Sequence, residues 1–140
     1  MVEFALLLPI FLAVLFLIID FGVGINHWVI VTNSTREGAR IGAVGASTND
    51  IADKVALTSN GLLAAADVSV NYVDAPGGNS QLGDRGDRVV VESDYEYGLI
   101  TPLGAFLSIA FDSLSFHSCT DMRLELPVSW ASNPDGVEGC

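Results

Sequence analysis

Basic residues are scarce in this chain. The 140 residues include 6 Lys and Arg against 17 Asp and Glu, giving a formal net charge of -11 and a pI near 4.2. A nucleic-acid-binding surface neutralises several phosphates at once with clustered Lys and Arg side chains. Six basic residues are too few to form such a patch. The composition therefore argues against nucleic acid as a partner. The same acidity predicts that the polar part of the chain faces bulk solvent.

The chain also lacks the short motifs of common catalytic and metal sites. No C-x-x-C, H-E-x-x-H or G-x-S-x-G occurs, and His27 and His117 lie far apart in the sequence. The tripeptide Arg85-Gly86-Asp87 spells an integrin-binding motif, which we interpret as a chance match in a Gly-rich loop. The aspartates of that loop do not have the spacing of a calcium-binding loop. We therefore expect no enzyme, no cofactor and no metal.

Charge is nearly absent from the first 31 residues. Their only ionisable side chains are Glu3, Asp20 and His27, and no base precedes Arg36. The apolar run Phe4–Ile25 would form a helix of roughly 33 Å, enough to cross a bilayer core of about 30 Å. A secretory signal peptide fits poorly, because the run has no basic flank, exceeds about 15 residues and lacks an A-x-A cleavage site. We expect a helix that inserts into a membrane or packs in a bundle of helices.

Nothing in the sequence ends this helix at Ile25. Polarity rises gradually after Val31, and the first plausible stop is Gly45-Ala46-Ser47-Thr48. We predict one helix from about residue 3 to 45, roughly 64 Å long, whose second half is too polar for lipid. This divides the chain into a hydrophobic helix, residues 1–45, and an acidic α+β head, residues 46–140.

Three residues depart from the apolar pattern and are candidate assembly residues: Glu3, Pro9 and Asp20. An ionised Asp20 near a bilayer centre costs about 2.5–3.5 kcal/mol, so it is either protonated or near an interface, or it contacts another helix. Pro9 removes a helix hydrogen bond and usually kinks a helix, a defect that neighbouring helices can compensate.

Gly38, Gly42 and Gly45 follow one another at about one helical turn. Such a strip of small residues lets another backbone approach closely. We expect it to seat the chain's own sheet rather than a partner helix.

The head has the pattern of a second helix, three strands and a long loop. The helix is predicted at about 49–64, the strands at 67–73, 88–97 and 113–126, and the loop at 75–87. We expect a three- or four-stranded antiparallel sheet packed on the polar half of the long helix.

Cys119 and Cys140 are the only cysteines. Two cysteines in an exported head favour one disulfide. It would hold the C-terminal tail, Pro127–Gly139, in place and would stabilise the fold by about 3 kcal/mol in the chain-entropy model. Two free thiols and an intermolecular bond are the alternatives.

Several segments together resemble the TadE-like family of pilins, of the tight-adherence (Tad, type IVc) branch of type IV pili. They are Val2–Pro9 (VEFALLLP), Ile18–Gly22 (IIDFG), Thr32-Asn33, Arg36–Arg40 (REGAR) and, more weakly, Asp121–Glu125 (DMRLE). The combination of VEFA-x-x-x-P with REGAR carries most of the specificity.

The resemblance implies a membrane protein that becomes a filament subunit. A prepilin peptidase would cut a short basic leader, and the inner-membrane assembly machinery would then move the apolar helix from the bilayer into a filament core. In that family the glutamate is the fifth residue of the mature chain, whereas Glu3 is the third residue here. We therefore expect either that two residues precede Met1 or that processing differs. A carboxylate at Glu3 can neutralise an α-amine of its own or a neighbouring subunit and so fix axial register.

Three hypotheses follow for the function. The first is a structural subunit of an extracellular filament, assembled from identical subunits and located at the cell surface. The second is a low-abundance minor pilin that primes or caps a pilus made of other pilins. The third is a single-pass membrane protein whose head binds a ligand.

Overall fold

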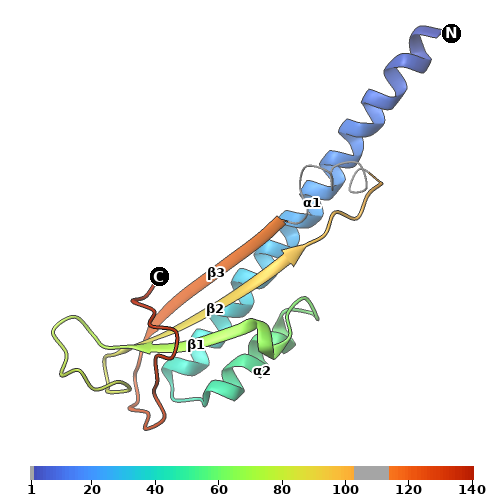
Figure 1. The fold of residues 1–140 in the computed structure, drawn as a ribbon. Coiled ribbons are helices and arrows are strands. Elements are labelled where there is room, and N and C mark those ends of the chain that lie inside the picture. The colour runs from blue at the N-terminus through green and yellow to red at the C-terminus, as the bar shows by residue number, and fades with distance from the viewer. Residues whose placement is uncertain (1, 103–113) are drawn as a thin grey trace. The chain divides into compact units, whose positions relative to one another are not determined.

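The computed structural model describes residues 2–102 and 114–140, with the side chains of Val2, Glu3 and Ala5 left out. Its elements are α1 (Val2–Ala43), α2 (Thr48–Thr58), the short 3-10 helix η1 (Ala65–Asp67), β1 (Val68–Val73), β2 (Arg88–Tyr97) and β3 (Leu114–Arg123). The predicted α+β class is confirmed: a long N-terminal helix is followed by a small antiparallel sheet, with β2 between β1 and β3 (Figure 1).

The chain forms two compact units, Met1–Trp28 with Glu96–Phe116 and Val29–Tyr95 with His117–Cys140. Parts of α1, β2 and β3 belong to each unit. These two units are defined by contacts within a single chain. The predicted division into residues 1–45 and 46–140 is a different one, between the part buried in a filament and the part outside it, and it stays a prediction.

The second unit has its core between α1, α2 and one face of the sheet. β1 and β2 pair antiparallel with Tyr72 opposite Val89 and Val70 opposite Val91. Because side chains alternate along a strand, these four share one face. The buried core contains residues from both helices, the sheet and the tail: Val31, Ala39, Ile51, Val55, Leu63, Tyr72, Val89, Val91, Leu124 and Val128.

A buried polar contact joins α1 to β3. The hydroxyl of Thr35 is fully buried and lies 2.9 Å from the hydroxyl of Ser118. Thr35 also donates to the carbonyl of Thr32 at 2.9 Å, so its oxygen is satisfied from both directions. Ser118 therefore points toward α1, and its neighbours His117 and Cys119 point to the opposite face of the sheet.

The second helix is shorter than predicted. It begins as expected, since Ser47 caps it by accepting from the Asp50 amide at 3.2 Å. It ends at Thr58 rather than near residue 64 because Asn60 and Gly61 take left-handed backbone angles, with φ of 56° and 82°.

The strip of small residues seats α2 as well as the sheet. A Cβ on Gly38 would overlap Cγ2 of Val55, and one on Gly42 would lie 3.0 Å from Ile51 Cδ1 and 3.1 Å from Val89 Cγ2. The strip was expected to seat the chain's own sheet, and at Gly38 this is wrong, because the neighbouring side chains there belong to α2. Gly45 has φ +92° and forms the turn that follows α1.

Gly38→Ala is expected to lower the free energy of unfolding by about 1–3 kcal/mol, because the new methyl group overpacks the contact with Val55. Gly22→Ala is the matched control. It lies on the same helix, a Cβ there meets nothing within 4 Å, and alanine is the better helix former. Denaturant unfolding in detergent, followed by circular dichroism, measures both. Equal stability of the two variants would contradict this packing.

Burial raises the pKa of the Tyr72 hydroxyl above its ordinary value of 10.0, an effect that Trp130 only partly opposes. Among the described residues the buried Tyr72 hydroxyl has no hydrogen-bond partner. In the unfolded chain this hydroxyl loses its proton at lower pH than in the folded chain. The free energy of unfolding should therefore fall as the pH rises above about 10.

Urea unfolding at about pH 8 and about pH 10.5 tests this dependence. Tyr72→Phe should lose part of the alkaline destabilisation, whereas Tyr95→Phe should keep it. An identical fall in wild type and Tyr72→Phe would show that Tyr72 is not its source.

Candidate assembly site

The N-terminal part of α1 presents large apolar side chains to the surroundings. Their exposed fractions run from 38% for Leu12 to 71% for Phe4. The set comprises Phe4, Leu6, Leu7, Leu8, Ile10, Phe11, Leu12, Val14, Leu15, Leu17, Ile18 and Ile19. We call Phe4–Ile19 the apolar stem. Because successive helical residues turn by about 100°, these side chains surround the helix rather than forming one stripe.

So much uncovered apolar surface identifies the apolar stem as the candidate functional surface. By length and composition, the helical stretch Leu6–Ala43 is able to cross a membrane. Monomeric soluble proteins rarely expose a contiguous apolar surface of this extent, and such a surface marks contact with a membrane or with another protein.

Two of the predicted assembly residues lie within or beside this stem. The backbone of Glu3 lies in the first turn of α1, and its side chain lies outside the described residues. Pro9 is exposed, and α1 is assigned as helix on both sides of it. The assembly roles of Glu3 and Pro9 remain predictions.

Asp20 ends the apolar stem and is buried by its own chain. Asp20 is only 4% exposed. Its Oδ1 accepts hydrogen bonds from the amides of Ile100 and Thr101, at 3.1 Å each. The Thr101 hydroxyl donates to Oδ2. Three donors from two consecutive residues thus satisfy this carboxylate. Sequence reasoning had instead predicted a protonated Asp20, an Asp20 near a lipid interface, or a contact with another helix.

Tyr97 extends this contact along the helix. Its hydroxyl donates to the Asp20 carbonyl at 3.2 Å, and its ring edge lies 3.5 Å from the Cβ position of Gly24. His27 packs edge-on against the same ring, with centroids 5.4 Å apart. Sequence reasoning missed these partners. The one available signal was Gly24, a second glycine within an otherwise bulky helix, which leaves room for an aromatic ring.

Asp20→Ala should release the turn at residues 100–101. Two partly buried amides would lose a charged acceptor, which costs about 1–3 kcal/mol and corresponds to about 5- to 150-fold faster local exchange. Hydrogen-exchange mass spectrometry of a peptide spanning residues 98–102 measures this. Asp94→Ala removes an exposed carboxylate elsewhere and should leave that peptide unchanged. Equal exchange in Asp20→Ala and wild type would refute the contact.

The predicted disulfide is present. Cys119 and Cys140 are bonded with their Cα atoms 5.8 Å apart, within the usual range. The tail is also held by Asn71, which donates to Asp135 at 3.0 Å, and by Arg88, which donates to the Glu138 carbonyl at 3.0 Å. The disulfide therefore closes an already bonded tail onto the sheet.

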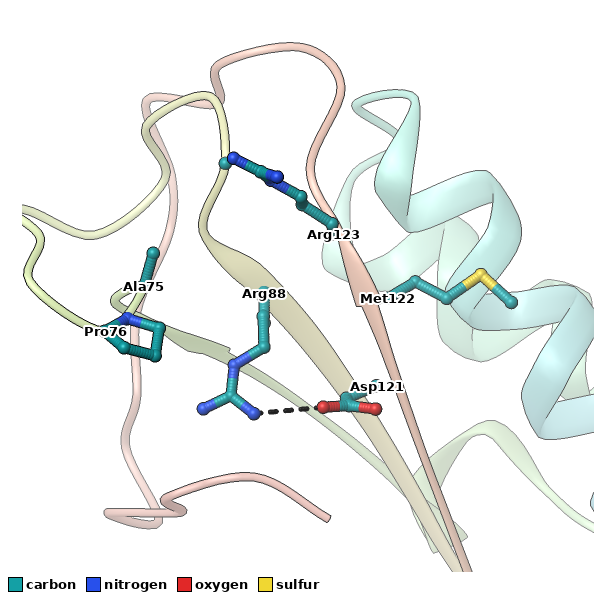
Figure 2. A pocket seen from close by; sticks show the side chains of 7 residues that line it. Ala75, Pro76, Arg88, Asp121, Met122 and Arg123 are labelled. Atoms are coloured by element: carbon teal, nitrogen blue, oxygen red, sulfur yellow. Dashed lines mark hydrogen bonds and ion pairs between the residues drawn. The ribbon is translucent and has the colours of Figure 1, made fainter.

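A shallow groove of about 420 Å³ lies where β2 begins and β3 ends (Figure 2). Its lining consists of Ala75, Pro76, Gly86, Arg88, Asp121, Met122 and Arg123. Arg88 donates to Asp121 at 3.0 Å. Figure 2 marks this contact with a dashed line. The lining has no hydroxyl, thiol or imidazole side chain, and its one carboxylate, Asp121, is already paired with Arg88.

The tripeptide Arg85-Gly86-Asp87 has a structural use. Asp87 is only 3% exposed, and its carboxylate accepts from the amides of Ala75 at 3.2 Å and Asp84 at 2.9 Å. A carboxylate turned into its own loop is not presented to a receptor.

Comparison with known proteins adds one finding. Residues 1–40 match the model of a family described as TadE-like protein. The N-terminal segment is TadE-like. No curated protein and no solved structure matches the chain. The match covers the apolar stem and most of α1 and ends before α2 and the sheet.

The TadE-like match associates the chain with the Tad pilus, and that family is one of pilus components rather than of enzymes. A TadE-like stem that is long and apolar suits membrane anchoring and a surface pilus. The geometry and the match point to the same segment, the stem.

Proposed function

We propose that this chain is a structural subunit of a Tad-type extracellular filament, with the apolar stem buried against the stems of neighbouring subunits. The observation that carries this proposal is the exposure of apolar side chains around Phe4–Ile19 in a TadE-like segment. Burial of such surface contributes about 25 cal/mol per Å². A helix that is apolar all round suits two environments, lipid before assembly and a protein core afterwards.

The contact at Asp20 limits the depth of membrane insertion. Residues with bonded polar groups lie against one side of the helix there, so the segment that lipid can surround on every side is the apolar stem, roughly 24 Å long. This is shorter than the Phe4–Ile25 span expected from sequence and shorter than a bilayer core of about 30 Å. Such a mismatch costs a fraction of a kcal/mol per Å. A shallow stem is easier to transfer from the bilayer into a filament.

Glu3 would set the position of each subunit along the filament. The nearest base in the sequence is Arg36, about 50 Å away along the helix, so a side-chain partner within the chain is out of reach. A carboxylate buried without a partner costs several kcal/mol. Pairing with an α-amine at the start of a neighbouring stem removes this cost and fixes one axial register. The partners in this proposal are identical subunits, other pilins, the prepilin peptidase and the inner-membrane assembly machinery.

Two alternatives predict different amounts of protein in the filament. A minor pilin that primes or caps a pilus uses the same stem but occurs in few copies per filament. A single-pass membrane protein with a ligand-binding head stays in the membrane. The described groove at Arg88 gives the last alternative little support, because its central cation is already bound to Asp121 and Glu138.

Glu3→Ala is expected to leave the chain synthesised and inserted in the membrane but to abolish its incorporation into filaments. The desolvation cost of the carboxylate disappears, so insertion is unchanged or improved, whereas the register contact is lost. Cells are sheared, and the filament pellet and the membrane fraction are compared by immunoblot. Glu37→Ala is the matched control on the same helix, since its exposed pairs with Arg40 and Lys54 contribute little.

Each outcome discriminates among the hypotheses. Abundant wild-type protein in the pellet supports a structural subunit, and a trace amount supports a minor pilin. Absence from the pellet supports the anchored protein. Glu3→Ala protein in intact filaments at wild-type amounts would refute the role of Glu3 in register.

A further inference from the structure

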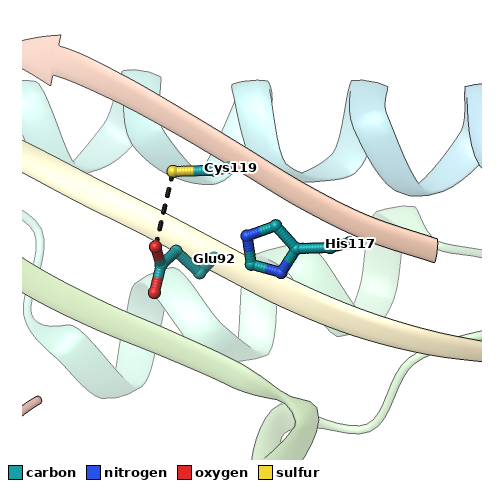
Figure 3. Close-up of side chains that lie close together, drawn as sticks. All are labelled: Glu92, His117 and Cys119. Carbon is teal, nitrogen blue, oxygen red and sulfur yellow. Dashed lines mark hydrogen bonds between the residues drawn. The ribbon is translucent and has the colours of Figure 1, made fainter. Parts of the chain in front are cut away.

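Three side chains that can bind a metal ion meet on the face of the sheet opposite the Thr35–Ser118 contact. Glu92 comes from β2, and His117 and Cys119 come from β3. One donor atom from each lies within 4.8 Å of the others. In Figure 3 the imidazole of His117 extends toward the Glu92 carboxylate and the Cys119 sulfur. All three residues belong to one compact unit.

The disulfide keeps this cluster from acting as a metal site. Cys119 Sγ lies 3.5 Å from Glu92 Oε1. A sulfur within a disulfide has no proton to donate and no thiolate charge, so in the oxidised protein this contact is neither a hydrogen bond nor a metal-binding pair. The thiolate is the form that binds metals. Reduction would release two such ligands, because Cys140 is bonded to Cys119.

A second observation concerns the orientation of His117. Its Nδ1 lies 2.9 Å from Oδ1 of Asp94. In metal sites, the binding histidine commonly donates its other ring N–H to a carboxylate, which fixes the tautomer and the ring plane. When Nδ1 carries the proton and donates it to Asp94, the lone pair on Nε2 remains available to bind a metal ion. Asp94 thus occupies the place of the supporting carboxylate.

We propose that the reduced chain binds one Zn²⁺ between Glu92, His117, Cys119 and Cys140, and that the disulfide closes this site. Two thiolates, an imidazole and a carboxylate are ligands that zinc takes in tetrahedral geometry. Metal–donor distances of about 2.0–2.3 Å require donors about 3.3–3.8 Å apart. The donor atoms of Glu92, His117 and Cys119 lie within 4.8 Å of one another, so side-chain shifts of about 1 Å bring them to that spacing. The sulfur of Cys140 is bonded to that of Cys119, so after reduction the two sulfurs need only move apart to the same spacing.

The disulfide form and the zinc-bound form interconvert by reduction and metal binding. A dithiol reductant supplies two electrons and two protons to the Cys119–Cys140 bond and is itself oxidised to a disulfide. Zinc binding then releases the two thiol protons to solvent. Reoxidation by an exogenous disulfide, which accepts the two electrons and is itself reduced to two thiols, removes both thiolates and frees the metal.

The inferred site would give the tail the same anchor before and after oxidation. The metal would join Cys140 to the sheet through the same strand residue that the disulfide uses. Disulfides form in oxidising compartments, so the newly made chain is the state in which zinc binds. The inference makes no use of filament assembly and stands independently of the proposed function.

The test uses the full chain in detergent, with Co²⁺ and then Zn²⁺ as the probes. Under a phosphine reductant, Co²⁺ should bind one ion per chain with thiolate-to-cobalt charge-transfer absorption, and Zn²⁺ should displace it. After oxidation, affinity for Zn²⁺ measured by calorimetry should fall by at least about 100-fold. Reduced chain that shows no charge-transfer absorption, or equal Zn²⁺ affinity in both redox states, would overturn the proposal.

Variants of the reduced chain locate the site. His117→Asn and Cys119→Ser should each weaken Zn²⁺ binding by about 100-fold, and Asp94→Asn by about 10- to 100-fold through the supporting bond. Glu125→Gln removes one exposed carboxylate outside the cluster and should change nothing. Circular dichroism confirms that each variant is folded. Zn²⁺ binding that survives His117→Asn unchanged would place the metal elsewhere and refute the assignment.

Discussion

The exposed apolar surface of the stem is the constraint on which the rest of the molecule depends. Residues Phe4–Ile19 expose large side chains around the helix, and the described part of the chain leaves them uncovered. Water is a poor environment for this surface, so the stem must lie in lipid or against other apolar chains. Residues from Val31 onward pack against α2 and the sheet, whereas the stem is left free.

Asp20 marks the change from one environment to the other. The carboxylate would be costly in lipid, but here it is satisfied by the turn at residues 100–101 and by Thr101. Tyr97, Gly24 and His27 extend the contact by one more helical turn. From Asp20 onward one side of the helix is covered by its own chain, while Phe21, Ile25 and Trp28 stay exposed on the other. Asp20 follows directly on the apolar stem within the TadE-like segment.

Local patterns predicted most of the fold. The bounds of β2 were predicted as residues 88–97, and α1 ends two residues before the predicted stop. The errors arise where contacts between distant segments decide. The end of α2 depends on left-handed angles at Asn60 and Gly61, and the neighbour of Gly38 is α2 rather than the sheet. The partners of Asp20 lie about 80 residues along the chain, where no periodicity connects them. The disulfide was predictable because the chain has only two cysteines.

The most direct test of the central claim is a cryo-electron microscopy reconstruction of filaments sheared from the cell surface. The account predicts a helical array in which every repeat is a copy of this chain, with the apolar stem in the core and Asp20 covered by the turn at residues 100–101. A core built of another polypeptide, with this chain absent or present only at one end, would contradict the role of structural subunit.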